Sequence, residues 1–368
     1  MSEFTTARPA DEFPAGKVPA GKVPVRKVPV RKVPATAGSP LLEVSDLRTY
    51  YPVRRGLVQA IARAPRRRVH AVDGVSFSLA RGEMMALVGE SGCGKTSTLQ
   101  TILGMVRPTS GTVSLDGIEI TAMSERQMRP LRRTVQMIYQ DPYESLDPRF
   151  RVRDTIAEPM LVHGIGSSRA DREPRIAAAL EQAGLTPPEI FLDRYPHELS
   201  GGQRQRVAIA ASLVLSPALL LADEPVSMLD VSVRAGVLSL LDSLRRSTNM
   251  AILMITHDLS TAAHFADRIA VMYLGRIVEQ GSASEVVRDP QHPYTRALLS
   301  VVPKRDPRDR TVPQILTGET PNPVDVPPGC RFHPRCPIAT DRCRTDDPLL
   351  RLPAAATGQD HLAACHLA

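Results

Sequence analysis

The sequence predicts an α/β protein whose core is a buried parallel sheet. Three compact apolar runs, "MMALV", "ALLLA" and "AILMI", are each followed at once by a polar cluster. Continuous apolar runs of this length are typical of strands buried on both faces of a parallel sheet. Because ligands bind beyond the carboxyl ends of such strands, the three polar clusters mark the expected site.

Shorter strands of a different kind are predicted near the start of this core. Apolar and polar residues alternate from Leu41 in "LLEVSDLRTYY", and again in "AVDGVSFSLARGE" and "GTVSLDGIEI". This alternation indicates antiparallel strands, with a turn expected at Asp116-Gly117.

Helical periodicity dominates the middle of the chain. The stretch "SRADREPRIAAALEQAG" places Ile176, Ala179, Leu180 and Ala183 on one face and is expected to end at Gly184. The stretch "VSVRAGVLSLLDSLRR" also predicts a helix, closing with two arginines near the negative end of its dipole. Residues 140–216 read as mostly helical, which predicts a helical lobe inserted into the α/β core.

Composition is that of a globular protein with a basic leader. Of 368 residues, 42% are hydrophobic and 23% charged, and no apolar stretch is long enough to span a bilayer. The net charge of +7 is compatible with nucleic-acid or anionic membrane partners, but much of it lies in four Lys-Val-Pro repeats within residues 15–34. Residues 1–40 therefore predict an extended basic arm, either a solvated tail or a contact for headgroups or nucleic acid. We expect no secretory signal, so the cysteines should meet a reducing cytosol.

The first polar cluster, "GESGCGKT" from Gly89 to Thr96, predicts a phosphate-binding loop. It fits G-x-x-x-x-G-K-[ST] between a buried strand and a helical stretch. Backbone N–H groups and the helix N-terminus can then hold phosphates, Lys95 supplies a charge, and the Thr96 hydroxyl is placed for Mg²⁺. Cys93 occupies a free position of the motif and receives no catalytic role.

The second and third clusters add acid and base groups at the same edge of the sheet. In "LLLADEP", Asp223 can hold Mg²⁺ through water and Glu224 can polarise an attacking water. His257 follows the next buried run. One such histidine is often structural, but three neighbouring strand ends with phosphate, metal and proton chemistry favour a catalytic site.

A second phosphate site is predicted in "LSGGQRQR", residues 199–206. Two glycines at the start of a helix expose N–H groups and a helix dipole to an anion. This element lies on a different lobe from the first loop, so we expect the two sites to face different nucleotides.

Together these motifs resemble the ATP-binding cassette (ABC) ATPases over residues 41–284. The resemblance implies a P-loop NTPase cassette with a mixed-sheet core, an N-terminal antiparallel β subdomain, a helical subdomain at about 141–216 and a small C-terminal cysteine-bearing extension at 285–368. Two cassettes would pair head to tail, with Glu224 as general base, His257 as γ-phosphate sensor and Gln140 contacting Mg²⁺ and the attacking water. Mg²⁺ would be held by Thr96, Gln140 and Asp223. The implied ATP contacts are Tyr51 (with Tyr50 second), Gly89, Glu90, Ser91, Gly92, Cys93, Gly94, Lys95, Thr96, Ser97, Ser200, Gly201, Gly202, Gln203 and Asp230, the last at the dimer contact.

The string "DPQHPYTRALL" after the cassette resembles an element of ATPases that power oligopeptide, dipeptide and nickel importers. That resemblance implies an ATPase on the cytoplasmic face of the membrane, bound to two permease subunits and a second ATPase, which is a paralogue or a second copy, and fed indirectly by an extracytoplasmic binding protein. No nucleic-acid partner is then expected. The alternative is a soluble cassette ATPase acting on nucleic acid in repair or translation, favoured by the positive charge and by cysteines that could bind zinc.

Four cysteines near the C-terminus, Cys330, Cys336, Cys343 and Cys365, predict a metal site. They lack the tight C-x-x-C spacing of most zinc sites, and their number suits either an iron–sulfur cluster or a structural zinc site. Similar tails in the peptide-importer ATPases imply a four-iron four-sulfur cluster, with zinc as the alternative. We expect it to staple a proline-rich tail that lacks a core of its own.

Overall fold

The computed structural model describes residues 39–53, 67–302, 314, 316, 318–354 and 360–368. The Lys-Val-Pro repeats lie outside these residues, so their extended form stays a prediction.

The main sheet carries the three predicted runs side by side. Within the described residues it has seven strands, in the order β11-β10-β9-β3-β8-β7-β6. Strands β6, β7, β8, β3 and β9 are parallel, whereas β10 runs antiparallel to β9 and β11. All residues of β3, β7 and β8 are buried, as predicted. The bounds are β3 Met84–Val88, β6 Val135–Ile138, β7 Leu219–Asp223, β8 Ala251–Thr256, β9 Arg268–Tyr273, β10 Arg276–Ser282 and β11 Leu362–Ala363.

A second, antiparallel sheet confirms the alternating pattern at the start of the cassette. Its order is β2-β1-β4-β5. Asp116 and Gly117 have φ of +49° and +71°, the left-handed pair that a tight hairpin turn requires. The bounds are β1 Leu42–Pro52, β2 Arg68–Leu79, β4 Ser110–Leu115 and β5 Ile118–Glu119.

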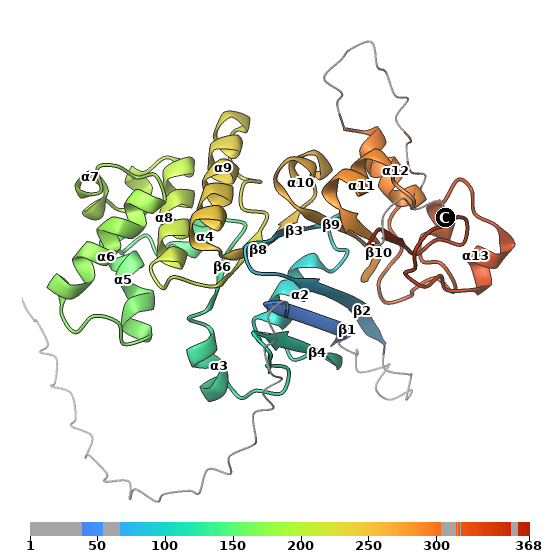
Figure 1. Ribbon diagram of the computed structural model, residues 1–368, viewed down its shortest axis with the longest axis horizontal. Coiled ribbons are helices and arrows are strands. Elements are labelled where there is room, and N and C mark those ends of the chain that lie inside the picture. The colour runs from blue at the N-terminus through green and yellow to red at the C-terminus, as the bar shows by residue number, and fades with distance from the viewer. Residues whose placement is uncertain (1–38, 54–66, 303–313, 315, 317, 355–359) are drawn as a thin grey trace, which may run out of the picture. The chain divides into compact units, whose positions relative to one another are not determined.

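The predicted helical lobe is also present. Helices α5, α6 and α8 pack on one another, and α8 also contacts α4, α9 and strand β6 (Figure 1). Helix α6 buries Ile176, Ala179 and Leu180 and ends before Gly184, whose φ is +72°. The lobe comprises α4 Pro142–Ser145, α5 Val152–Val162, α6 Arg169–Gln182, α7 Glu189–Leu192, the 3-10 turn η1 Pro196–Glu198 and α8 Gly201–Leu213.

The remaining helices flank the sheets or belong to the C-terminal region. Helix α9 is present as predicted and buries Val237, Leu238, Leu241 and Leu244. Arg245, predicted to lie near the negative end of the helix dipole, also makes specific hydrogen bonds. Its buried side chain donates to Asp242, Asp267 and the Gly82 carbonyl oxygen. These elements are α2 Lys95–Ile102, α3 Glu125–Leu131, α9 Val231–Thr248, α10 Leu259–Phe265, α11 Ala283–Arg288, α12 Pro293–Ser300, η2 His333–Arg335 and α13 Asp341–Thr345.

The C-terminal region packs into the core of the cassette, and its buried aromatic residues belong to that core. Tyr294 of α12 and Phe332 are fully buried and belong to the cluster that also contains Tyr273 of β9. The ring centroids of Tyr273 lie 4.8 Å from Tyr294 and 5.2 Å from Phe332. Strand β11 also adds to the main sheet beside β10. Sparse aromatic residues, which carry no periodicity, provide this packing.

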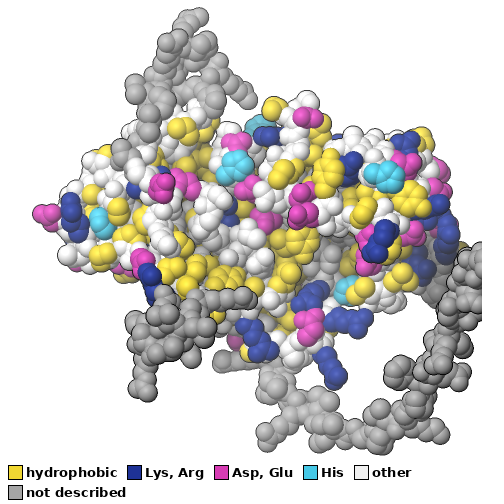
Figure 2. All heavy atoms as spheres, turned by 180° about the vertical axis from the view of Figure 1, so that it is seen from behind, with side chains coloured by type: hydrophobic (Ala, Val, Ile, Leu, Met, Phe, Trp, Pro, Cys, Tyr) yellow, Lys and Arg dark blue, Asp and Glu magenta, His cyan; other side chains and the backbone are white. Residues whose placement is uncertain are grey.

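Among the helices of the described ranges, none is long and apolar enough to cross a bilayer. Acidic and basic side chains are interspersed over most of the face that Figure 2 shows.

Candidate active site

A cavity of about 630 Å³ lies where the strands of the main sheet end. The phosphate loop follows β3, Gln140 follows β6, Glu224 follows β7 and His257 follows β8. The structure therefore brings together the polar groups that the sequence placed at separate strand ends. The lining residues are Tyr51, Val69, Ala71, Ser91, Gly92, Gly94, Lys95, Thr96, Ser97, Gln140, Glu224, His257 and Pro323.

The phosphate loop packs so closely against β2 and β9 that only glycine fits at two positions. A Cβ on Gly94, where φ is +108°, would lie 1.9 Å from the Ala71 carbonyl oxygen. A Cβ on Gly89 would lie 2.2 Å from the Met272 carbonyl oxygen. The loop therefore leads into the N-terminus of α2 with its backbone exposed to the cavity.

Lys95 is buried at the base of this loop. Its Nζ donates to the carbonyl oxygens of Gly89 at 2.7 Å and Glu90 at 2.9 Å. A buried ammonium group beside free backbone N–H groups attracts phosphate oxygens.

The side chains of Gln140 and His257, which follow two other strands, both contact the Glu224 carboxylate. Its Oε2 accepts from Gln140 Nε2 at 3.1 Å and lies 3.2 Å from His257 Nδ1. Glu224 has φ of +44°, a conformation that is uncommon for a residue with a side chain and that clusters at functional sites. The carboxylate is thereby held at the cavity between an amide and an imidazole.

Asp223 and Thr96 have the chemistry that a hard cation needs. Burial raises the pKa of Asp223, the neighbouring Glu224 acts in the same direction, and the Thr96 hydroxyl opposes the shift. A buried carboxylate whose charged form is disfavoured gains from a divalent cation, and Mg²⁺ prefers carboxylate and hydroxyl oxygens. The residues present therefore fit Mg²⁺.

The two candidate aromatic residues for adenine take different places. Tyr51 lines the cavity, whereas the Tyr50 hydroxyl donates to Asp73 at 2.5 Å. Burial, together with this hydrogen bond, raises the pKa of Tyr50 to about 12. The Tyr50 hydroxyl is therefore engaged by Asp73, whereas Tyr51 lies at the cavity wall, where its ring can contact a base.

The second predicted phosphate element stands apart from this cavity. Ser200 caps α8: its Oγ accepts from the Gln203 backbone N–H at 3.3 Å, while its own N–H donates to Gln203 Oε1 at 3.0 Å. Gly201 and Gly202 form the first turn, and Asp230 is exposed at the start of α9. None of these residues is among those that line the cavity.

Sequence reasoning missed part of the cavity wall and included residues that do not reach it. Val69, Ala71 and Pro323 line the cavity, although no motif contains them. Four residues that were predicted to contact the nucleotide or its metal ion are not among those that line the cavity: Gly89, Glu90, Cys93 and Asp223.

The four C-terminal cysteines gather in one region as free thiols. Burial raises the pKa of Cys330 to about 11, and Cys343, Cys365 and Cys336 act in the same direction. The Cys330 N–H donates to the Cys343 carbonyl oxygen at 2.9 Å, and Leu367 N–H donates to Cys365 Sγ at 3.4 Å. Among the described residues, however, no three His, Cys, Asp or Glu side chains lie close enough together to hold a metal ion.

The phosphate loop, the Asp223-Glu224 pair and His257 meet at adjacent strand ends, and a second glycine-bearing helix start lies on an inserted lobe. This combination defines an ATP-binding cassette ATPase. Comparison with known families agrees. The family model described as "ABC transporter" matches residues 72–227. The model "Oligopeptide/dipeptide transporter, C-terminal region" matches residues 278–343. The chain belongs to the ABC transporter ATPases that carry this C-terminal region.

Alignments with curated relatives extend over most of this chain and nearly all of each relative. The oligopeptide transport ATP-binding protein AppF of Bacillus subtilis is 43% identical, over 89% of this chain and 97% of its own. The di/tripeptide transport ATP-binding protein DppF of Pseudomonas aeruginosa is 46% identical, over 85% of this chain and 94% of its own.

Solved structures give the same fold for the cassette. The dimeric ATP-binding cassette MJ0796, bound to ADP and Pi in a post-hydrolysis state, has a TM-score of 0.57 and 26% identity, over 66% of this chain and 98% of that one. The cbiO1 protein of Clostridium perfringens, part of the transporter complex cbiONQ, has a TM-score of 0.58 and 28% identity, over 68% and 91% of the two chains. The cassette is therefore an ATPase of the ABC type.

Proposed function

We propose that this chain is the energy-coupling ATPase of a membrane importer for dipeptides and oligopeptides. The observation that carries the proposal is the union, in one chain, of an ATPase site with the C-terminal region found in oligopeptide and dipeptide transporters. Relatives that are 43% and 46% identical carry the names of peptide transport ATP-binding proteins.

The positions around the cavity support the following catalytic roles. Lys95 and the loop N–H groups hold the β and γ phosphates. Glu224, accepting from Gln140 Nε2, is the general base for the attacking water, and His257 contacts the γ-phosphate. Thr96, Gln140 and Asp223 would hold Mg²⁺, which would supply positive charge next to the phosphates.

We propose further that a second cassette completes each ATP site. The first turn of α8, with Ser200, Gly201, Gly202 and Gln203, presents backbone N–H groups that the cavity of the same chain does not use. Across a head-to-tail dimer these groups, with Asp230, face the partner's ATP. Closure then requires nucleotide because each phosphate chain satisfies donors from both cassettes. The partner is a paralogue or a second copy of this chain.

The membrane side of the assembly consists of two permease subunits, which hold the ATPases at the cytoplasmic face. An extracytoplasmic binding protein delivers the peptide to them. In domain terms, residues 41–284 are the nucleotide-binding unit, with a helical subdomain at about 141–216, and residues 285–368 are the importer-type region.

Reconstitution with the permeases tests this function. We expect the protein to purify with two multi-span subunits, and its ATP hydrolysis in proteoliposomes to rise when peptide-loaded binding protein is added. Tight, salt-sensitive DNA binding without membrane partners would instead support the nucleic-acid alternative.

We propose that Cys330, Cys336, Cys343 and Cys365 bind a four-iron four-sulfur cluster, with a zinc ion as the alternative. The four thiols lie in one region, although in the described structure no three of them are close enough together to hold an ion, so binding would have to draw them together. Two polar groups near sulfur support the proposal: the Leu367 N–H, which donates to Cys365 Sγ, and the Thr340 hydroxyl 3.3 Å from Cys343 Sγ. Thiols whose pKa burial raises need a cation to ionise, which metal binding supplies. Iron and acid-labile sulfide in anaerobically purified protein would support the cluster, whereas stoichiometric zinc without iron would favour the alternative.

A further inference from the structure

The C-terminal region reaches the phosphate loop through one residue, Glu90. This residue occupies a position that the loop motif leaves free, yet each of its polar groups has a partner. Its N–H donates to the Tyr294 hydroxyl at 2.9 Å, and its carbonyl oxygen accepts from Lys95 Nζ at 2.9 Å. Its carboxylate accepts from Arg335 at 2.8 and 3.2 Å and from the Thr320 hydroxyl at 2.6 Å. Three of these four partners belong to the C-terminal region.

The ion pair between Arg335 and Glu90 is partly shielded from water, mainly on the side of the arginine. The Arg335 side chain is only 9% exposed, and its guanidinium lies 5.9 Å from the centre of the Tyr273 ring. Burial acts to raise the pKa of Glu90, but the hydrogen bonds from Arg335 and Thr320 outweigh it, so the pKa of this carboxyl is lowered. A two-pronged, buried contact of this kind fixes geometry as well as charge.

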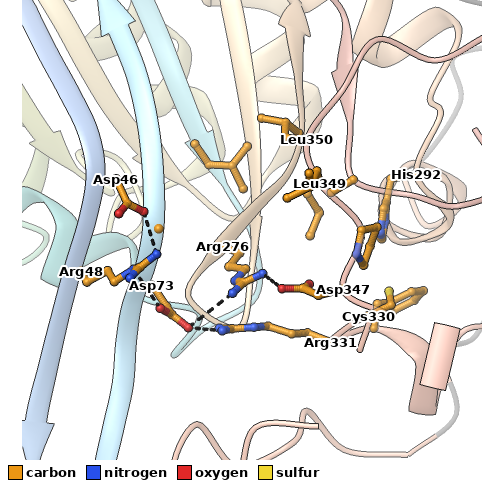
Figure 3. A pocket seen from close by; sticks show the side chains of 16 residues that line it. Asp46, Arg48, Asp73, Arg276, His292, Cys330, Arg331, Asp347, Leu349 and Leu350 are labelled. Carbon is orange, nitrogen blue, oxygen red and sulfur yellow. Dashed lines mark hydrogen bonds and ion pairs between the residues drawn. The ribbon is translucent and has the colours of Figure 1, made fainter. Parts of the chain in front are cut away.

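A second arginine anchors the same segment to the cassette. Arg331 pairs with Asp73 of β2, as Figure 3 shows, and its Nη1 donates to the Leu274 carbonyl oxygen at 2.5 Å. Asp73 in turn accepts from Tyr50, the neighbour of Tyr51. Because Arg331 and Arg335 lie four residues apart, and Arg335 is the last residue of η2, the anchor limits how far Arg335 can move.

The same region also forms part of the nucleotide cavity itself. Pro323 lines the cavity beside Tyr51, and its carbonyl oxygen accepts from the His70 N–H at 2.9 Å. Residues 320–335 therefore contact the site at its phosphate end and along its wall.

We propose that Arg335 and Thr320 are positioning residues of the nucleotide site, which hold Glu90 so that the backbone N–H groups of the loop face the phosphates of ATP. Nucleotide affinity then depends on the docked C-terminal region. Without these two partners the Glu90 carboxylate would be left partly buried and unpaired, and the loop would leave its binding geometry to rehydrate that group. The inference concerns how the C-terminal region supports nucleotide binding, and it is independent of what is transported.

The test measures binding and turnover of the purified full-length protein. A fluorescent ATP analogue and inorganic tripolyphosphate serve as probes for Arg335→Ala, the isosteric Thr320→Val and the conservative Arg335→Lys. Arg342→Ala is the matched control, because Arg342 lies in the same region and its side chain pairs, among the described residues, only with the exposed Asp346. A double-mutant cycle with Glu90→Gln tests whether both changes act through the same contact.

We expect Arg335→Ala to weaken binding of both probes at least about fivefold and to raise KM for ATP, with kcat at saturating ATP nearly unchanged. Thr320→Val should have a smaller effect in the same direction, Arg335→Lys should recover part of the loss, and Arg342→Ala should bind normally. In the Glu90→Gln background the Arg335→Ala effect should largely vanish. Normal binding by Arg335→Ala and Thr320→Val with a lowered melting temperature would overturn the proposal, as would additive effects in the cycle. If Arg335→Ala does not fold, Thr320→Val and Arg335→Lys decide the question by the same criteria.

Discussion

Glu224 Oε2 lies 3.2 Å from His257 Nδ1, so a carboxylate after β7 and an imidazole after β8 meet at one edge of the sheet. The contact joins the end of one buried strand to the end of its neighbour, 33 residues further along the chain. Because the two side chains meet at the nucleotide cavity, substitution there can test whether Glu224 is the general base.

Changing Glu224→Gln keeps the shape of the side chain and removes its basicity. If Glu224 is the general base, turnover should fall by about 100-fold or more, while the affinity for ATP stays near that of the wild type. Hydrolysis assays together with binding of a fluorescent ATP analogue separate the two effects. Gln136→Ala serves as the control, because Gln136 of β6 contacts backbone oxygens outside the cavity. Turnover retained by Glu224→Gln would mean that another group is the base.

Changing Tyr51→Ala should weaken ATP binding by about tenfold, because stacking on an aromatic ring stabilises a bound base by roughly 1–3 kcal/mol. Binding of inorganic tripolyphosphate, which has no base, should be unaffected. Tyr50→Phe is the control: it removes the hydrogen bond to Asp73, so we expect a lower melting temperature with little change in ATP affinity. A tenfold loss with Tyr50→Phe and none with Tyr51→Ala would reverse the assignment.

His292 should make the protein sensitive to mild acid. This side chain is 1% exposed, and its Nδ1 accepts from the Tyr294 N–H at 3.1 Å. Burial lowers the pKa of His292 to about 4, with Glu279 opposing and Arg296 assisting the shift. The unfolded chain takes up the proton at a higher pH, so this group costs stability as the pH falls from about 6.5 towards 4, by up to about 3 kcal/mol.

Chemical unfolding of His292→Asn at several pH values checks this prediction. Asparagine can still cap α12 through its side-chain oxygen but does not ionise. The variant should lose less stability than the wild type between pH of about 6.5 and 4. Parallel pH profiles for the two proteins would contradict the prediction.

His361 should have the opposite pH dependence. Its Nε2 lies 2.8 Å from Glu279 Oε1, both residues are buried, and Glu279 also accepts from the N–H groups of Gln291 and His292. The contact with Glu279 raises the pKa of His361, against the effect of burial. The stabilisation is therefore complete below the unfolded pKa of about 6.5 and is lost as the pH rises through the folded value. His361→Gln should be destabilised more at pH of about 6 than at pH of about 9, measured as free energy of unfolding; an equal loss at both would disagree.

The buried strands and the chemistry at their ends could be predicted because both are local in sequence. Apolar runs identified β3, β7 and β8, and the motif around Lys95 identified the phosphate loop. The partners of Glu90 could not be predicted in this way. Arg335 lies 245 residues away, and no period or motif links the two positions. Tyr294 and Phe332 were missed as core residues for a related reason: isolated aromatic side chains carry no periodic signal.

The cysteines illustrate a different limit. Their number predicts a metal site, but the spacing of the sulfur atoms depends on loops that carry no regular pattern, and in the described residues no three such side chains lie close enough together to hold an ion. The sequence can therefore identify the cysteines as candidate metal ligands, but it does not determine the distances between their sulfur atoms.

The pairing of β11 with β10 has a consequence for synthesis of the chain. Gln280 and Leu362 are neighbours in the sheet, yet the ribosome makes the whole C-terminal region between them. Until Leu362–Ala363 emerges, the outer edge of β10 presents unpaired backbone groups to other nascent chains, and exposed edges of this kind template aggregation. Within the described residues, β11 is made after every other strand of the main sheet, so it pairs with β10 only after the rest of that sheet has been translated. We expect a chaperone that shields β10 in the interval to improve the yield of folded protein.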